Sequence, residues 1–181
     1  GGHLLVMMSN AEWISKKQVF AAVHAGKNRR DLTFANAKDR WFPNTSPPAF
    51  VTIVKNPSDP TEQEMVAAVR AQFDCVLRRE PREDELSRYL ELLRSTIELG
   101  GNREGLRLML AGVLLESEFL YRHEFGEGEP DEFGRRLLSP EEAANALAYA
   151  LSDRGPDASL QQAAAAGELQ TKADYRRHVE R

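Results

Sequence analysis

The sequence predicts an all-α protein: a small antiparallel helical bundle followed by a second, incomplete helical array, with an N-terminal part that is irregular apart from one helix. Three observations lead to this fold class. Apolar residues recur at intervals of three and four from about residue 61 onward. Helix-capping residues stand at the expected starts, and glycine or proline follows the expected ends. Only the segment AFVTIVK has the β-branched character of a strand, and a single strand has no evident partner.

The overall composition indicates a water-facing protein. Its 181 residues are 41% hydrophobic and 29% charged, which suits one domain of average size or two small ones. The formal net charge of -4 offers no basic excess to a nucleic-acid backbone, so no nucleic-acid partner is expected. The apolar runs are far shorter than the roughly 20 residues that cross a bilayer, so no membrane span is predicted. Cys75, the single cysteine, cannot form an internal disulfide and is expected to be a small buried residue.

Residues 1–60 contain one expected helix and an irregular segment. Ser9 followed by Glu12 has the spacing of a capping box, and Trp13, Phe20 and Val23 then recur at helical spacing. Gly26 is expected to end this helix. From there to residue 60, turn residues and prolines dominate, so the segment is predicted to be irregular and to contain a domain boundary.

Residues 61–125 are predicted to form a three-helix module. Thr61 and Glu64 have the spacing of a capping box for the first helix, Gly100-Gly101 is expected to end the second helix, and Asn102 can cap the third. Short turns between amphipathic helices favour antiparallel packing. The expected apolar stripes are, in order, Met65, Val66, Val69, Phe73, Val76 and Leu77; Leu86, Tyr89, Leu90, Leu93 and Ile97; and Leu106, Met109, Leu110, Val113 and Leu114.

The second helical array is expected to follow an acidic linker at residues 126–134 and to occupy residues 135–181. Ser139, Pro140 and Glu142 have the pattern of an N-cap, a first helical residue and the returning acid of a capping box. Further helices are expected after two later caps, and the inner face of the first helix is expected to hold three apolar residues. The later caps are Asp157 and Thr171 with Asp174, and the inner-face residues are Leu147, Ala148 and Leu151.

Both ends of the chain predict a piece of a longer protein. The sequence starts GGHLLVMM without an initiator methionine and stops at HVER inside an expected helix. We therefore expect further domains on the parent polypeptide.

Two stretches carry a family resemblance. RRLLSPEEAANALAYALSDRGPDASLQQAAAAGELQ and the residues after it resemble the start of the module called domain-of-unknown-function family 1592, from about residue 135. The preceding helices, at about residues 62–125, are similar to family 1595. The residues that carry this second resemblance are Arg78-Arg79, Glu83 to Leu86, Ser117, Phe119, Leu120, Tyr121, Arg122 and Glu124.

The resemblance implies a context rather than a reaction. Such modules occur in large planctomycete-type and myxobacterial-type exported proteins, often linked to a c-type cytochrome-like domain. It therefore implies a periplasmic or cell-surface location, other domains of the same polypeptide as partners, and haem elsewhere in the parent chain. No cofactor is expected in residues 1–181, because covalent haem needs Cys-x-x-Cys-His and Cys75 is the single cysteine.

One departure from the family pattern affects the stretch LLESEFLYRHE. Glu118 stands where the family usually has proline, which would force a helix break. Without that proline, we expect the third helix to run further. Phe119 is then expected to be buried against the second module, with Arg122 or Glu124 in an ion pair at the junction.

The sequence predicts no catalytic, cofactor-binding or metal-binding residues. The four histidines, at positions 3, 24, 123 and 178, lack the spacing that puts two ligands on one helix face, and His123-Glu124 are neighbours that point about 100° apart. Gly126-Glu127-Gly128 lies among acids that would repel a phosphate. Ser152-Asp153-Arg154 is similar to a serine acyl-transfer motif but lacks the Ser-x-x-Lys partner. Ordinary solvated faces explain the pairs Arg29-Arg30, Arg78-Arg79 and Arg176-Arg177. Asn44-Thr45-Ser46 fits a glycosylation acceptor, a motif that is expected to be idle in a bacterial-type protein.

Two classes of function stay open. The first is a non-catalytic helical scaffold or interaction module within a larger exported, cytochrome-linked bacterial protein. The second is part of a larger enzyme, carbohydrate-active or redox, whose catalytic groups lie outside this chain. The acids Glu80, Glu83, Asp84 and Glu85 could serve such an enzyme, but carboxylates in a first helical turn are already favoured by the helix dipole. A more remote reading is docking of the acidic linker on a basic electron-transfer partner.

Overall fold

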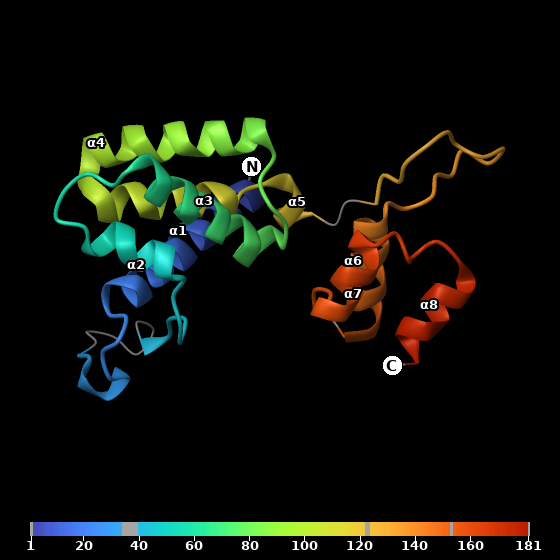
Figure 1. The fold of residues 1–181 in the computed structure, drawn as a ribbon, viewed down its shortest axis with the longest axis horizontal. Helices are drawn as coiled ribbons and strands as arrows, with labels where there is room; N and C mark the ends of the chain where they lie inside the picture. Colours follow the sequence, from blue (N-terminus) through green and yellow to red (C-terminus); the bar gives the residue numbers. More distant parts are fainter. Residues whose placement is uncertain (1, 34–39, 122–123, 153, 181) are drawn as a thin grey trace. The chain divides into compact units, whose positions relative to one another are not determined.

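The computed structural model describes residues 2–33, 40–121, 124–152 and 154–180. Its elements, in order, are the helices α1 (Gly2–Val23), the 3-10 turn η1 (Arg29–Asp31), α2 (Pro48–Lys55), α3 (Glu62–Leu77), α4 (Glu83–Val113), α5 (Ser117–Leu120), α6 (Pro140–Ser152), α7 (Ala158–Ala165) and α8 (Lys172–Val179) (Figure 1). The predicted all-α class is confirmed. The chain divides into two compact units, residues 1–120 and 121–181, which are described separately.

The segment AFVTIVK is helical, so its strand-like reading was wrong. It forms most of α2, which starts at Pro48, where a missing amide costs nothing. Phe50, Ile53 and Val54 are buried at the three- and four-residue spacing of a helix face. Burial of that face outweighs the strand preference of the β-branched residues, because propensity is the weaker influence.

Helix α1 starts much earlier than predicted. It begins at Gly2, so Ser9 lies inside the helix, and Glu12 pairs with Lys16 at 2.6 Å instead of returning to a cap. Trp13 is 44% exposed and stacks on Trp41 with ring centroids 5.1 Å apart, so it does not face the core as expected. The buried residues of α1 are Ala11, Ser15, Lys17, Ala21 and Ala22. The predicted end is confirmed, since α1 stops at Val23 and Gly26 has a positive φ of 85°.

Helix α3 follows the prediction closely. Thr61 Oγ1 accepts from the amide of Glu64, and the Glu64 carboxylate accepts from the amide of Thr61 at 2.7 Å, which completes the capping box. Met65, Val69 and Phe73 are buried on its inner face. Cys75 lies on the opposite side and is exposed, so its predicted burial was wrong. Its position, two residues from Phe73, points it about 200° away around the helix.

Helix α4 is a helical hairpin. Gly101 has φ 77° and ψ 174°, which interrupts the helix where Gly100-Gly101 was expected to end it, and the two arms run side by side (Figure 1). The side-chain amide of Asn102 donates to the carbonyls of Asn56 and Ser58 at 3.1 and 2.9 Å. The turn of the hairpin is thereby fixed to the loop that follows α2.

The core of the first unit contains residues of α1, α2, α3 and both arms of α4. Gln72 is a polar residue that packs among them. It is fully buried on α3, donates to the carbonyl of Leu110 at 3.0 Å and accepts from the side chain of Gln18 at 2.9 Å. One amide group therefore connects three helices. The buried apolar residues of this core are Ala22, Phe50, Ile53, Val54, Met65, Ala68, Val69, Phe73, Tyr89, Leu93, Ile97, Leu106, Met109, Leu110 and Val113.

The second unit has a small, alanine-rich core. The predicted caps of its helices are confirmed: Ser139 with Glu142, Asp157, and Thr171 with Asp174. The buried set is Ala143, Ala144, Ala148, Leu160, Ala163, Ala164 and Leu169. Leu151 is 59% exposed, so its predicted inner position was wrong. It follows Ala148 by three residues, but α6 ends one residue later at Ser152.

The expected acidic linker has local structure. Glu127 and Leu137 form an isolated antiparallel bridge, and the carboxylate of Asp131 accepts from the amides of Phe133 and Arg135. These contacts make residues 127–137 a closed turn, and the backbone bonds to Asp131 lower the pKa of its carboxyl, with the Arg135 side chain adding to the effect. Phe125, just before this turn, is also joined to the first turn of α6, because its amide donates to the carboxylate of Glu142 at 2.9 Å.

The close approach of the two arms of α4 makes a test of the hairpin. A Cβ at Gly105 would lie 2.5 Å from Ile97 Cγ1 and 2.8 Å from the backbone nitrogen of Ile97. We expect Gly105→Ala to lower the free energy of unfolding by about 1–3 kcal/mol in urea denaturation, because the arms must separate.

Gly2→Ala, at the exposed start of α1, is the control. A Cβ at Gly2 would meet no other heavy atom within 4 Å. We expect unchanged stability or a gain of up to about 1 kcal/mol from helix propensity. Equal stability of both variants and the parent would contradict the close contact of the arms.

Candidate functional site

The largest group of ionised side chains in the described part of the first unit lies at the turn between α3 and α4. Arg78 ends α3 in the left-handed conformation, with φ 59° and ψ 29°, and its amide donates to the carbonyl of Phe73. This reversal of the chain places the next residue, Arg79, over the ring of Phe73 at 5.5 Å. The first turn of α4 then brings Glu85 opposite Arg79. We call Arg79, Arg82, Glu85 and Glu118 the arginine clamp.

Glu85 is the buried member of the arginine clamp. Its side chain is 2% exposed, and its carboxylate lies 2.8 and 2.9 Å from the two terminal nitrogens of Arg79. It also accepts from Arg82 through Nη2 at 2.6 Å and through the backbone amide at 2.8 Å. The hydrogen bonds from Arg79 are the main cause that lowers the pKa of Glu85 to about 2. Burial by itself would raise this pKa, and the hydrogen bond from the Arg82 amide lowers it further.

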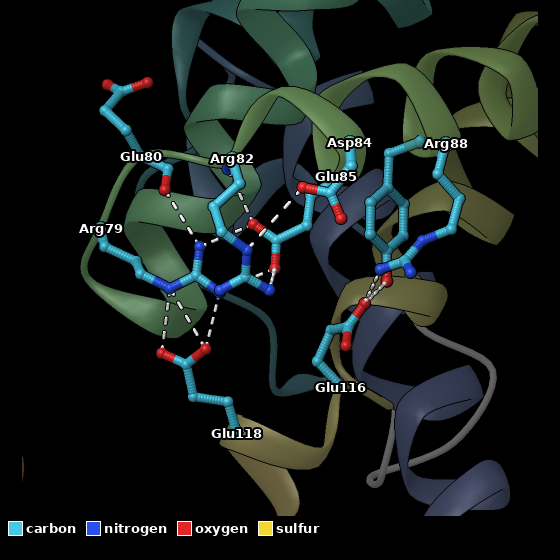
Figure 2. Close-up of polar contacts among 9 residues, drawn as sticks. Arg79, Glu80, Arg82, Asp84, Glu85, Arg88, Glu116 and Glu118 are labelled. Carbon is cyan, nitrogen blue, oxygen red and sulfur yellow. Dashed lines mark hydrogen bonds and ion pairs between the residues drawn. The ribbon is translucent and has the colours of Figure 1, made fainter. Parts of the chain in front are cut away.

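Arg79 joins Glu85 to Glu118 on α5. Figure 2 shows its guanidinium between the two carboxylates. Nε lies 3.0 Å from Oε1 of Glu118, and Nη2 lies 2.6 Å from Oε2, which is a bidentate contact. Nη1 also donates to the carbonyl of Glu80 at 3.0 Å. Bonds to two carboxylates raise the pKa of Arg79 further above its ordinary value, so its charge is fixed.

A second group lies one helical turn along α4. The hydroxyl of Tyr89 donates to Glu116 at 2.5 Å, and Nη2 of Arg88 donates to the same oxygen at 2.6 Å (Figure 2). Burial raises the pKa of Tyr89, and the Glu116 hydrogen bond adds to this, so the phenol stays protonated. Glu116 belongs to the short link between α4 and α5. Both groups therefore attach residues 116–118, where this link meets α5, to the α3–α4 turn and the start of α4.

The chemistry that this arrangement supports is positioning rather than proton transfer. A general acid or base works best with a pKa near the operating pH, whereas the Glu85 carboxyl stays ionised down to about pH 2. Each carboxylate of the arginine clamp is already bonded to a guanidinium. The clamp therefore fixes α5 and the first turn of α4 to the α3–α4 turn.

The stretch LLESEFLYRHE breaks where the prediction had the helix continue. Helix α4 ends at Val113, and α5 is a separate helix of one turn, so the extended third helix was wrong. Phe119 is 45% exposed, and its expected contact with the second module stays a prediction. This break occurs without proline, because Tyr89 holds Glu116 in the link between the helices and Arg79 holds Glu118 in α5. Arg122 and His123 lie outside the described residues, so the predicted ion pair of Arg122 is not described either.

The other residues singled out from the sequence are dispersed. Of the four acids around the start of α4, only Glu85 is buried; the side chains of Glu80 and Asp84 are 74% and 76% exposed. Ser152 Oγ donates to the carbonyl of Ala148 within its own helix, and Asp153 lies outside the described residues. Among the residues that the structure describes, no three His, Cys, Asp or Glu side chains gather as metal ligands, and no helix is long and apolar enough to cross a membrane.

Sequence reasoning missed a cavity of about 390 Å³ in the first unit. It lies between the end of α1 and residues 42–46, and Phe42 and Pro43 form part of its apolar wall. Asn44-Thr45-Ser46, which had suggested only a glycosylation pattern, lines it as well. No sequence signal joins this segment to α1, because the two are far apart along an irregular stretch.

The comparisons with known proteins concern the second unit. Its helices α6, α7 and α8 follow the cap at Ser139, where the resemblance to family 1592 places the start of a module. Residues 138–181 match the family model PSD4, described as a protein of unknown function (DUF1592). No curated protein and no solved structure matches the chain. The match supports the family 1592 part of the resemblance, and the family 1595 part stays a prediction.

The arginine clamp predicts a specific dependence of stability on pH. Glu85 has a pKa of about 2 in the folded chain against an ordinary value of 4.5, so its stabilisation is complete above about pH 4.5 and is lost as the pH falls toward 2. We expect Glu85→Gln to lower the free energy of unfolding by about 3 kcal/mol at pH 7. In urea denaturation, the difference from the parent should shrink steadily between pH 5 and pH 2.

Glu83→Gln is the control for this measurement. Glu83 is an exposed carboxylate in the same helical turn, so we expect a loss below about 0.5 kcal/mol. Equal losses for the two variants, or a loss for Glu85→Gln that does not change with pH, would count against the clamp.

Replacing Glu118 tests whether its ion pair or the backbone holds α5. At the start of α5, the backbone amides of Phe119 and Leu120 donate to the carbonyl of Glu116. The amide of Glu118 donates in none of the backbone hydrogen bonds found among the described residues outside the helices. Proline should therefore fit at this position. We expect Glu118→Gln and Glu118→Pro to lose similar stability, each less than about 1 kcal/mol, because the side chain is 39% exposed. A much larger loss for proline in thermal unfolding would show that the amide is needed.

Proposed function

We propose that this chain is a non-catalytic helical scaffold or interaction module within a larger exported, cytochrome-linked bacterial protein. The observation that carries the proposal is the arginine clamp. Its buried carboxylate, Glu85, is ionised at neutral pH, because its pKa is lowered to about 2, and it is bonded to Arg79 and Arg82. Groups committed in this way hold helices in place and leave little capacity for proton transfer.

The arrangement of the elements also supports a scaffold. Capping boxes fix the starts of α3, α6 and α8, and the turn of the α4 hairpin is bonded to the loop after α2. Such caps stabilise each helix by roughly 1 kcal/mol. The result is a set of helices whose exposed faces are held in fixed positions, as an interaction module requires. The exported, cytochrome-linked context comes from the resemblance of the sequence to families 1595 and 1592.

The alternative is part of a larger enzyme whose catalytic groups lie on other segments. One observation favours it, namely the cavity next to α1, because concave sites with a few polar groups are where ligands bind. In that case this chain would contribute a binding surface, and the reacting groups would come from elsewhere.

The test of the scaffold proposal uses the full parent polypeptide, purified from its exported fraction. A lysine-specific cross-linker followed by mass spectrometry should join exposed lysines of both units, such as Lys55 and Lys172, to domains outside residues 1–181. An absorption spectrum should show c-type haem in the same preparation. Unfolding the protein in urea before cross-linking is the control and should remove the links between domains.

Three results would contradict the proposal or part of it. Cross-links confined to pairs within residues 1–181 would mean that the module holds no neighbouring domain. A parent protein without haem, and without Cys-x-x-Cys-His in its reading frame, would remove the cytochrome-linked context. Turnover of a substrate that Glu85→Gln abolishes, with folding intact, would favour the enzyme instead.

A further inference from the structure

The cavity beside the end of α1 has one apolar and one polar side. Its apolar lining includes Ala21, Leu32, Phe42 and Pro43. The ring of Phe20 braces this wall, because it packs edge-on against Phe42 at 5.0 Å between centroids. Phe42 is 8% exposed and is therefore a fixed part of the wall. A volume of about 390 Å³ is at the small end of the range for ligand pockets.

The polar side is rich in hydrogen-bond donors. Lys27, Thr45 and Ser46 line it together with His24 and Asn44, and the described lining contains no carboxylate. Ser46 Oγ is a buried atom that has no hydrogen-bond partner among the described residues. A buried hydroxyl without a partner costs free energy, and an oxygen atom of a ligand would recover it.

His24 has one ring nitrogen already engaged. Nδ1 lies 2.9 Å from the carbonyl oxygen of Phe20, and since a carbonyl can only accept, Nδ1 carries a hydrogen. The ring also lies against the ring of Phe20 at 4.1 Å. The imidazole is therefore held in one orientation, and Nε2 of the neutral ring is a hydrogen-bond acceptor, so His24 is not assigned a carboxylate oxygen.

The end of α1 would by itself disfavour an anion, because the carbonyl end of a helix carries partial negative charge. Two cations oppose this effect. Lys55 donates to the carbonyl of Ala25, a lining residue, at 3.2 Å, and Lys27 lines the cavity itself. A full positive charge at close range outweighs the half charge of a helix terminus.

We propose that this cavity binds a small monocarboxylate with an apolar body. The carboxylate oxygens lie against Lys27 and Ser46, and the apolar body lies against Phe42 and Leu32. A carboxylate matches one ammonium and one hydroxyl donor, and the apolar wall distinguishes such a ligand from an inorganic anion. This inference is independent of the scaffold function, since the arginine clamp contributes none of these residues.

The test uses benzoate as the probe and the whole chain of 181 residues. In a ¹⁵N-resolved NMR titration, benzoate should saturably shift the amide signals of residues 21–27, Phe42 and residues 44–46, since Pro43 has no amide hydrogen. Benzyl alcohol, which has a similar shape and no charge, should bind at least about tenfold more weakly.

Lys27→Gln and Ser46→Ala should each weaken benzoate binding by about fivefold or more, as loss of a charged hydrogen bond does. Lys16→Gln, which alters an exposed lysine outside the lining, should bind as the parent does.

A second readout separates a change in binding from a change in folding. Ser46→Ala removes a buried hydroxyl that has no partner, so its thermal midpoint without ligand should stay equal to that of the parent or rise. Equal affinity for benzoate and benzyl alcohol, shifts spread outside the lining, or unchanged affinity in both variants would overturn the proposal. A fall in the midpoint of Ser46→Ala would also overturn it, because the hydroxyl would then have a partner within the protein.

Discussion

The charge on Glu85 is the constraint on which the arrangement around α4 depends. A carboxylate that is 2% exposed would cost several kcal/mol if it were alone, so the chain must keep a guanidinium beside it. Arg79 meets that need only while α3 ends at Arg78 in its left-handed turn. Since the same guanidinium holds Glu118, one buried charge determines the end of one helix, the start of the next and the position of a third. A change at Glu85, Arg79 or Glu118 is therefore expected to weaken the contacts of the other two. The effects of such changes on the free energy of unfolding should not add.

Much of the fold could be predicted from local sequence signals, because those signals act over three or four residues. Thr61 with Glu64, Ser139 with Glu142 and Thr171 with Asp174 were read correctly as caps. The reading of α2 as strand-like failed because its β-branched residues were given more weight than the spacing of its apolar face. The start of α1 was placed at Ser9 for a similar reason: the two residues of a capping box occurred together by chance inside a longer helix.

The sites could be predicted much less well, because they join distant residues. Arg79 and Glu118 are 39 positions apart and meet only after the chain reverses at Gly101. Arg79, Arg82 and Glu85 at three-residue spacing were a visible signal, yet the acids of this region were explained as exposed partners of the helix dipole. That explanation holds for Glu83 and fails for Glu85, because only the latter faces the core. The cavity gave no signal at all, since its walls come from an irregular stretch and the far end of α1.

The stack of Trp13 on Trp41 has a practical consequence for studying this protein in solution. These are its only tryptophans, and both belong to residues 1–120, so the second unit has no tryptophan. Tryptophan emission will therefore follow the separation of α1 from residue 41, and unfolding of α6 to α8 will leave it unchanged. Far-ultraviolet circular dichroism records the helices of both units. A difference between the two signals during denaturation would show that the units unfold independently, in which case a single free energy of unfolding would not describe the chain.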